Sequence, residues 1–236
     1  MTGLLTGVPL FPLGTVLFPG ALLPLHIFET RYRRLVAGLQ ERDPDQRQFG
    51  VVAIKAGREV GIPASRGEEN SGGPTLYGVG CLAGLRAAEA YSDGRWDIVA
   101  AGTRRFRLID IDPVTDPDEP VTGTVEVLSE LTSAHAGDLV PTVTRHFLEY
   151  RDAMYRAQGR VAEPAADLPA DPVLLSYLVA AAAVVDLPEK QRLLAAETAG
   201  ARLDLELALL RRESALLATL ATRPAVELGR QPYSTN

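Results

Sequence analysis

The sequence has one cysteine, Cys81, among its 236 residues. A single thiol cannot form an internal disulfide, which is typical of proteins in a reducing compartment. No Lys or Arg precedes Arg31, so the apolar N-terminus lacks the charged region of a signal peptide. Uninterrupted apolar runs of about 20 residues, the length that spans a membrane, are also missing. These absences predict a cytoplasmic protein without a membrane partner, in which Cys81 is a small buried side chain.

The sequence also has no excess of basic residues. Residues 1–130 carry 13 basic and 17 acidic groups, and residues 131–236 carry 11 and 13, so the net charge is −6. Nucleic-acid binders usually concentrate positive charge on one face. The acidic balance of both halves therefore argues against a nucleic-acid partner.

The motifs of several catalytic classes are absent. The sequence contains no Gly-x-x-x-x-Gly-Lys-Ser/Thr loop for phosphates, no Gly-x-Ser-x-Gly elbow, and no His-Glu-x-x-His or Cys-x-x-Cys pair. Its only lysines are Lys55 and Lys190, and its histidines, His26, His135 and His146, are isolated. We therefore expect no catalytic residue, no metal site and no cofactor, and we expect that the chain is not an enzyme.

The stretch from Val8 to Leu39 contains two apolar runs that prolines interrupt, followed directly by a helical pattern. The prolines at positions 9, 12, 19 and 24 lack a backbone donor, so these strands must lie at an edge or bend around a closed sheet. Four apolar residues then recur at steps of four, three and four, which predicts one buried face of an α-helix. They are Phe28, Tyr32, Leu35 and Leu39.

Further strands are predicted over 49–55, 76–91, 96–101, 105–111 and 121–128, from β-branched residues and alternating patterns. Asp93-Gly94 predicts a hairpin turn, and Gly102-Thr103 is expected to form another turn. The segment 61–74, rich in glycine and charge, is expected to be a mobile loop. About six short strands with glycine and proline bends favour a β-barrel over residues 1–130.

Helical patterns begin near Ser133. Asp171-Pro172 predicts a helix start. The buried face of the helix that follows is expected to carry Leu174, Leu175, Leu178, Ala182 and Val185. The longest helix, 201–220, should bury Leu203, Leu207, Leu210 and Leu217 and leave Glu206 mostly outside that face. Residues 131–222 are therefore predicted to form a helical bundle, and residues 223–236 a flexible tail.

Two segments near the N-terminus carry a specific resemblance. Pro-Leu-Phe-Pro-Leu-Gly-Thr-Val-Leu-Phe-Pro-Gly at 9–20 and Pro-Leu-His-Ile-Phe-Glu-Thr-Arg-Tyr at 24–32 closely resemble the opening of the Lon protease N-terminal (substrate-binding) domain family. The likeness continues through residues 102–108, 171–172 and 190–194, so it covers about residues 8 to 220. It implies an α+β fold, a PUA-like β-barrel with one packed helix, followed by a C-terminal α-helical bundle.

The resemblance also implies a function. A complete Lon protease joins this domain to ATPase and peptidase modules, and the motifs of both modules are missing here. We therefore expect a stand-alone, non-catalytic binding module that recognises unfolded polypeptide or a protein partner, as an adaptor in protein turnover. An extended segment would bind by strand addition at a barrel edge or in the groove between barrel and bundle. The alternatives are an RNA-binding PUA-like protein and a small-ligand site in that groove.

Four charged residues, Glu29, Arg31, Arg33 and Arg34, occur where the last proline-containing strand gives way to the first helix. They are candidates for a charged rim that contacts a partner, with the arginines mostly directed away from the buried face. The alternative is structural, because a carboxylate is favourable at a helix start and an arginine can tie the strand to the helix. His26 could act as an acid or base near neutral pH, but a hydrogen-bonded structural role is favoured.

Overall fold

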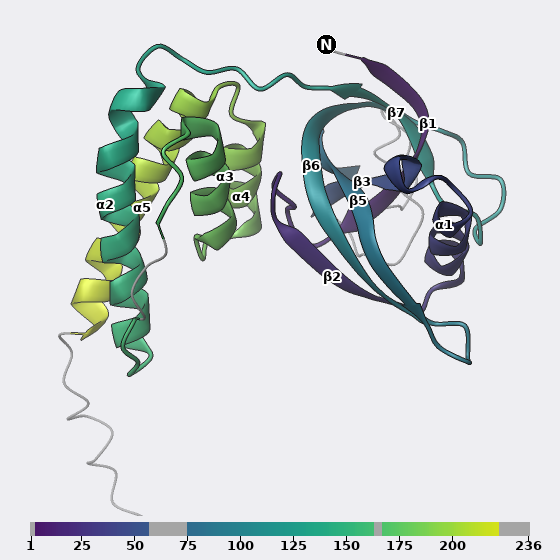
Figure 1. The fold of residues 1–236 in the computed structure, drawn as a ribbon, viewed down its shortest axis with the longest axis horizontal. Coiled ribbons are helices and arrows are strands. Elements are labelled where there is room, and N and C mark those ends of the chain that lie inside the picture. Colours follow the sequence, from purple (N-terminus) through teal and green to yellow (C-terminus); the bar gives the residue numbers. More distant parts are fainter. Residues whose placement is uncertain (1–2, 57–74, 163–166, 222–236) are drawn as a thin grey trace, which may run out of the picture.

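The structure, a computed structural model, describes residues 3–56, 75–162 and 167–221. The strands form a barrel, and the later helices pack beside it (Figure 1). The strands are β1 (Leu4–Leu13), β2 (Leu22–Ile27), β3 (Gln48–Ala56), β4 (Thr75–Leu76), β5 (Val79–Ala90), β6 (Trp96–Ile111) and β7 (Thr122–Val127). The helices are α1 (Thr30–Gln40), the 3₁₀ helix η1 (Pro44–Gln46), α2 (Ala136–Ala157), α3 (Pro172–Ala182), α4 (Leu187–Ala195) and α5 (Ala199–Ala221). The predicted loop over 61–74 and the predicted tail over 223–236 lie outside the described residues.

The barrel is closed by five strands in the order β1-β7-β6-β5-β3, with β3 returning to β1 in a parallel pair. The other pairs in this ring are antiparallel. β2 stands outside the ring and pairs with β6 alone among the named strands. α1 lies against the side of the barrel that faces away from the later helices (Figure 1). The predicted α+β fold, a barrel with one packed helix followed by a helical bundle, is confirmed.

The expected turn at Gly102 and Thr103 is wrong. β6 runs from Trp96 to Ile111 without interruption, and its pairing with β5 passes from Arg104 to Gly102 while skipping Thr103. One extra residue on one strand is a β-bulge, which bends the strand and increases its twist. The glycine therefore marks a bend within a strand rather than the end of one.

Gly102 also allows a close backbone approach. Its N–H donates to the carbonyl oxygen of Ala21 at 2.9 Å, and its own carbonyl accepts from the N–H of Gly20 at 2.9 Å. A Cβ atom at position 102 would collide with the carbonyl oxygen of Phe18. Only a glycine lets β6 take the loop before β2 as a neighbour at this distance.

Two helices of the second half begin at a capping aspartate, and the sequence predicted the first of these starts, at Asp171-Pro172. The side chain of Asp171 accepts a hydrogen bond from the N–H of Leu174 at 2.8 Å, and Pro172 occupies the first turn of α3. Asp186 caps α4 in the same way, through the N–H of Glu189 at 2.9 Å. These caps satisfy backbone donors that the helix itself cannot pair.

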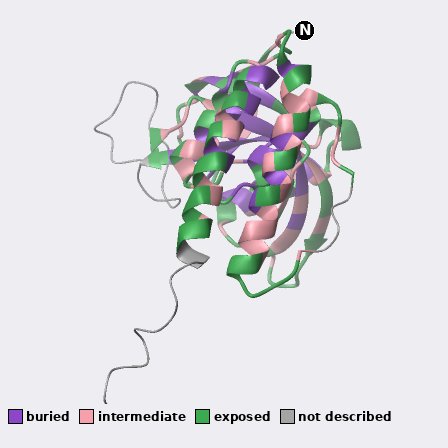
Figure 2. Ribbon diagram, turned by 90° about the vertical axis from the view of Figure 1, so that its left-hand side faces the viewer, coloured by how far each residue is buried: buried purple, intermediate pink, exposed green. Residues whose placement is uncertain are grey.

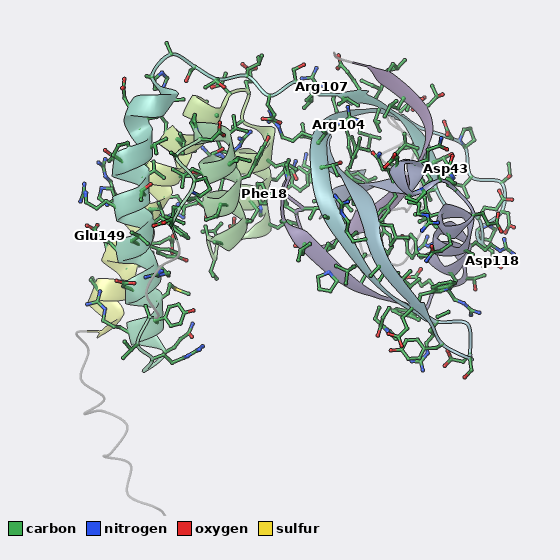
Figure 3. The ribbon with its side chains drawn as sticks, in the orientation of Figure 1. Phe18, Asp43, Arg104, Arg107, Asp118 and Glu149 are labelled. Atoms are coloured by element: carbon green, nitrogen blue, oxygen red, sulfur yellow. The ribbon has the colours of Figure 1, made fainter. Side chains whose placement is uncertain are left out.

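The barrel contributes to the core of the helical part. Phe18, from the loop between β1 and β2, is buried within the cluster formed mainly by α2, α3, α4 and α5 (Figure 3). The side-chain amide of Gln191 in α4 donates to the carbonyl oxygen of Val79 in β5 at 2.8 Å. Figure 2, which looks at the helices from outside, shows exposed residues on their outer faces and buried segments behind them. Apolar packing and direct hydrogen bonds thus hold the two parts together.

The apolar pattern of α1 is only partly confirmed. Tyr32, Leu35 and Leu39 are buried against the barrel, with the ring of Tyr32 stacked on Phe11 at 3.9 Å between centroids. Phe28 precedes the helix and is exposed. Cys81 is buried as predicted, and burial raises the pKa of its thiol to about 12.

A Gly102→Ala substitution tests the close approach at the bulge. We expect it to lower the free energy of unfolding by about 1–3 kcal/mol, because the added methyl group must displace backbone. Urea unfolding followed by circular dichroism measures the change. Gly38→Ala in α1 is the matched control, since a Cβ there meets nothing within 4 Å and alanine favours helix. Equal unfolding curves for Gly102→Ala and the unsubstituted chain would contradict this account.

Candidate functional site

A cleft of about 750 Å³ lies between the barrel and α3. Its barrel side consists of Thr103 in the bulge of β6 and the loop residues Pro19, Gly20 and Ala21. Its other wall is mainly apolar and comes from α3 and the preceding segment: Pro169, Val173, Leu174, Tyr177, Leu178, Ala181 and Ala182. Among the described residues that line the cleft, Glu130 is the one that carries a charge.

The face of α3 that forms this wall was predicted to be buried, and that prediction is wrong. Leu174 is 59% exposed and Leu178 is 36% exposed, and Ala182 is also exposed, although all three were expected to be buried. The residues that α3 buries are Leu175, Ser176, Tyr177, Val179 and Ala180. Because α3 is apolar on nearly every side, periodicity could not distinguish the face in the helical core from the face in the cleft.

A buried arginine of β6 binds Glu130, which lines the cleft, and the end of α4. Arg105 is 2% exposed, and it donates to the carbonyl oxygens of Leu194 and Ala196, at the end of α4, at 2.8 and 2.5 Å. It also donates to the carboxylate of Glu130 at 2.8 and 3.3 Å. An ion pair with both oxygens engaged fixes the orientation of the carboxylate. Arg105 therefore joins a barrel strand, the segment after β7 and the end of α4.

A second buried arginine, Arg202 of α5, lies behind the same wall of the cleft and contacts Tyr177 and Glu130. Arg202 of α5 is fully buried and donates to the carbonyl oxygen of Leu193 at 3.0 Å, to Ser176 Oγ at 2.9 Å and to the hydroxyl oxygen of Tyr177 at 3.2 Å. Its guanidinium lies 4.0 Å from the centre of the Tyr177 ring and 3.8 Å from the carboxylate of Glu130. Burial lowers the pKa of Arg202 and raises the pKa of Tyr177. These contacts position Tyr177, which lines the cleft.

A lysine of α4 holds the far end of α3. Lys190 Nζ donates to the carbonyl oxygens of Ala180 and Ala181 at 2.6 and 2.7 Å, and it lies 5.6 Å from the centre of the Phe18 ring. Burial lowers the pKa of Lys190 to about 8. A cation near the last carbonyls of a helix is favourable, and here it also fixes α3 relative to the loop before β2.

Glu206 of α5 is fully buried, although it was expected outside the apolar face of that helix. Neither of its carboxyl oxygens has a hydrogen-bond partner among the residues that the structure describes. Burial raises the pKa of Glu206 well above its ordinary value, and the positive charges of Arg202 and Lys190 only partly oppose this effect. The carboxyl group is therefore protonated at pH values at which an exposed glutamate is ionised.

Comparison with known proteins identifies the family. The family model of the ATP-dependent protease La (LON) substrate-binding domain matches residues 7–212. The chain belongs to the Lon substrate-binding domain family. This Lon-type domain is 25% identical over 222 residues to Lon protease 2 of Myxococcus xanthus, and 25% identical over 211 residues to the Lon protease of Anaeromyxobacter dehalogenans (strain 2CP-C). Each alignment covers 89% of this chain but 24% of the relative, so the chain spans about a quarter of their length.

Solved structures show the same fold. The Lon N-terminal domain protein from Xanthomonas campestris superimposes with a TM-score of 0.59 at 22% identity, over 86% of this chain and 98% of that one. The N-terminal domain of the Mycobacterium avium complex Lon protease gives a TM-score of 0.54 at 14% identity, over 89% of this chain and 98% of that one. These likenesses support the fold of the Lon-type domain.

The four charged residues that the sequence singled out lie around α1, on the side of the barrel that faces away from the cleft (Figure 1). Arg31 is buried, contrary to the expected outward orientation, and its guanidinium donates to the carboxylate of Glu29 at 2.6 Å. The guanidinium of Arg33 lies against Gly94 in the β5–β6 hairpin. Arg34 is exposed and pairs with Asp116 at 3.2 Å.

His26, which the sequence offered as an acid or base, lies beside a carboxylate. His26 forms a 2.6 Å contact from Nδ1 to Asp97, and Asp97 also accepts from the hydroxyl of Tyr91. Among the described residues, no three His, Cys, Asp or Glu side chains converge in a way that could hold a metal ion. Within the same residues, no helix combines the length and the apolar character needed to cross a bilayer.

Replacement of Arg105 should weaken the junction between barrel and helices. We expect Arg105→Ala to lower the free energy of unfolding by about 3–5 kcal/mol, because it removes the short hydrogen bonds to Glu130 and to the carbonyl oxygens of Leu194 and Ala196. The longer contacts of Arg202 with Glu130 and Ala196 would remain. Chemical denaturation measures the loss. Arg104→Ala, at an exposed position on the same strand, is the control and should have no measurable effect (Figure 3). Similar losses for both variants would show that Arg105 has no special role.

The raised pKa of Glu206 predicts a pH-dependent stability. The folded chain binds a proton at Glu206 that the unfolded chain releases near pH 4.5, so this group's contribution to stability is complete below that pH and is lost as the pH rises. Glu206→Gln should therefore gain stability over the unsubstituted protein as the pH rises from 4.5 to 7, by up to about 1.4 kcal/mol per pH unit.

Urea unfolding at several pH values measures this gain. Lys190 does not contribute in this range, because its folded-state pKa is about 8. Exposed Glu197 provides the control substitution, Glu197→Gln, which should leave the pH dependence unchanged. Parallel curves for Glu206→Gln and the unsubstituted protein would contradict the assignment.

Proposed function

We propose that this chain is a non-catalytic module that binds unfolded polypeptide, or a flexible segment of a protein partner, as an adaptor in protein turnover in the cytoplasm. The observation that carries the proposal is the apolar cleft beside α3, in a member of the Lon substrate-binding domain family. Unfolded chains differ from folded proteins chiefly in the apolar side chains that they expose. Leu174 and Leu178 offer such side chains a surface on which to be buried.

Contacts within the chain hold the cleft in a defined shape. Arg105 and Gln191 join the barrel to α4, and Lys190 joins α4 to the end of α3. A preformed site does not have to be ordered on binding, although an unfolded client does. We therefore expect moderate affinity, with little dependence on the exact client sequence.

The residues around α1 form a proposed second contact surface. Arg34 stands at the rim of a pocket of about 450 Å³ between α1 and the segment 112–120, and it is exposed. Arg33 lies next to the hairpin, and Glu29 and Arg31 hold the start of the helix. A folded partner that binds here would leave the cleft open for a client, which is the arrangement that an adaptor requires.

A small ligand is the second candidate for the cleft. A volume of about 750 Å³ falls within the usual range for small-molecule sites, and Glu130, Tyr177 and Thr103 provide polar groups at its base. The open apolar wall favours a polypeptide, because α3 presents a row of aliphatic side chains that a compact polar molecule would not cover.

Fluorescence anisotropy tests the proposal with a labelled unfolded polypeptide, such as a reduced and carboxymethylated protein, at low and moderate salt. We expect saturable binding that tolerates salt. The double variant Leu174→Ser/Leu178→Ser should weaken it by about tenfold or more, because full burial of one leucine is worth about 1.5–3 kcal/mol. Leu216→Ser on α5, at a position that is 52% exposed and outside the cleft, is the matched control.

A parallel titration with single-stranded RNA distinguishes the main alternative. Binding to RNA alone, with a steep loss as salt increases, would overturn the proposal in favour of a nucleic-acid function. Equal weakening by the cleft variant and by Leu216→Ser would remove the cleft from the proposal.

A further inference from the structure

The geometry of β2 determines which of its backbone groups face outward. β2 pairs with β6 in antiparallel register, with Leu22 opposite Ala101 and Pro24 opposite Val99. The N–H of Gly102 donates to the carbonyl oxygen of Ala21 at 2.9 Å. In an antiparallel ladder, hydrogen-bonded pairs alternate with pairs whose N–H and C=O groups point away from the partner strand. The bond between Gly102 and Ala21 marks a hydrogen-bonded position, so the next pair, Leu22 and Ala101, is of the second kind. Leu22 is therefore a residue of the outward-facing set.

The position of Pro24 agrees with this assignment. Proline has no N–H, so an edge strand tolerates it where the N–H would have faced outward. Outward-facing groups recur at every second residue of a strand. Leu22 and His26 therefore each direct a donor and an acceptor to the outer edge of β2, and Pro24 directs an acceptor.

This edge is open among the residues that the structure describes. No backbone hydrogen bond joins Leu22, Pro24 or His26 to another described segment, and β2 is paired with β6 alone among the named strands. Figure 1 shows β2 at the front of the barrel with one edge uncovered. Unpaired edges of this kind bind other extended chains readily.

The edge leads directly into the cleft. Ala21, the residue before β2, lines the cleft, and Leu22 is among the most exposed leucines of the chain. An extended polypeptide that lies along β2 would therefore pass between Ala21 and the α3 wall. Only an extended strand presents donors and acceptors at the two-residue spacing that this edge offers.

We propose that the outer edge of β2 binds the client polypeptide as an added β-strand, which continues into the cleft beside α3. This inference rests on the proposed function and deepens it by assigning the client's main chain to β2 and its apolar side chains to the cleft. Recognition through main-chain groups tolerates many sequences, because every residue except proline carries the same donor and acceptor.

Two other strands with an unpaired edge suit this role less well. β4 has two residues, Thr75 and Leu76, which is too short to hold a segment in register. The N-terminal half of β1 pairs with β7 through an irregular register between Leu5 and Val8. Neither strand contributes a residue to the cleft beside α3.

A backbone N-methyl scan tests the proposal with the unsubstituted protein. The probe is a labelled peptide of about ten residues, long enough to cover β2 at roughly 3.4 Å per residue, with leucines alternating with polar residues so that its register is fixed. Its amide nitrogens are methylated one at a time. We expect every second methyl group to weaken binding by about three- to tenfold and the intervening ones to have little effect, because only alternate amides would face β2.

A pair of protein variants provides an independent test. His26→Pro removes one outward donor without removing a bond to β6, and it also removes the imidazole contact with Asp97. His26→Ala removes only the side-chain contact. We expect His26→Pro to bind the unmethylated peptide about three- to tenfold more weakly than His26→Ala, while circular dichroism shows the same fold for both.

The outcomes separate this inference from the function on which it rests. Binding of the unmethylated peptide that depends on Leu174 and Leu178 but shows no alternation in the methyl scan would overturn strand addition and leave the cleft as the site. No binding of the unmethylated peptide would overturn both. An alternating scan with equal affinities for His26→Pro and His26→Ala would place the added strand on an edge other than β2.

Discussion

The guanidinium of Arg105 is buried between the barrel and the helices. The hydrogen bonds that this charged group makes there fix the position of the helices relative to the barrel. Its partners come from two places that are distant in sequence, the carboxylate of Glu130 and the carbonyl oxygens at the end of α4. A buried charge is tolerated only when its hydrogen-bonding groups are paired. The barrel and α4 can therefore separate only at a high energetic cost.

The cleft is a consequence of this junction. α4 is held to the barrel by Arg105 and Gln191, and Lys190 then holds the end of α3 at a fixed position beside the loop before β2. The ring of Phe18 lies next to the ammonium group of Lys190, with 5.6 Å between the nitrogen and the ring centre. Because these contacts involve α4 and the end of α3, the exposed face of α3 is left free to form a wall.

The sequence predicted the fold well, because local signals fixed it. Prolines in the first strands, the Asp93-Gly94 turn and the helix start at Asp171 each act over a few residues, and the structure contains the corresponding elements. The errors occurred where long-range packing decides. Gly102 suggests a turn by composition but is required for contact with a loop about 80 residues earlier in the chain.

The candidate site could be predicted only in outline. A groove between barrel and bundle was expected, but its residues were not, because α3 is apolar on nearly every side and Leu174 looked like core. Arg105 belongs to a run of arginines whose pattern does not reveal which one turns inward after the bulge. Glu206 was expected mostly outside the leucine-rich face of α5, and no local signal indicates that it is buried and unpaired.

Pro24 has a consequence for how copies of this chain behave toward one another. An open edge that can bind other polypeptides is also able to bind the same edge of a second molecule, which is how many sheets begin to aggregate. When two β2 strands approach in antiparallel orientation about Pro24, each presents an acceptor at the centre and neither presents a donor. The missing N–H groups would weaken self-association at the point where the two edges meet, whereas an extended chain of another sequence, without proline at that point, would still offer its own N–H there.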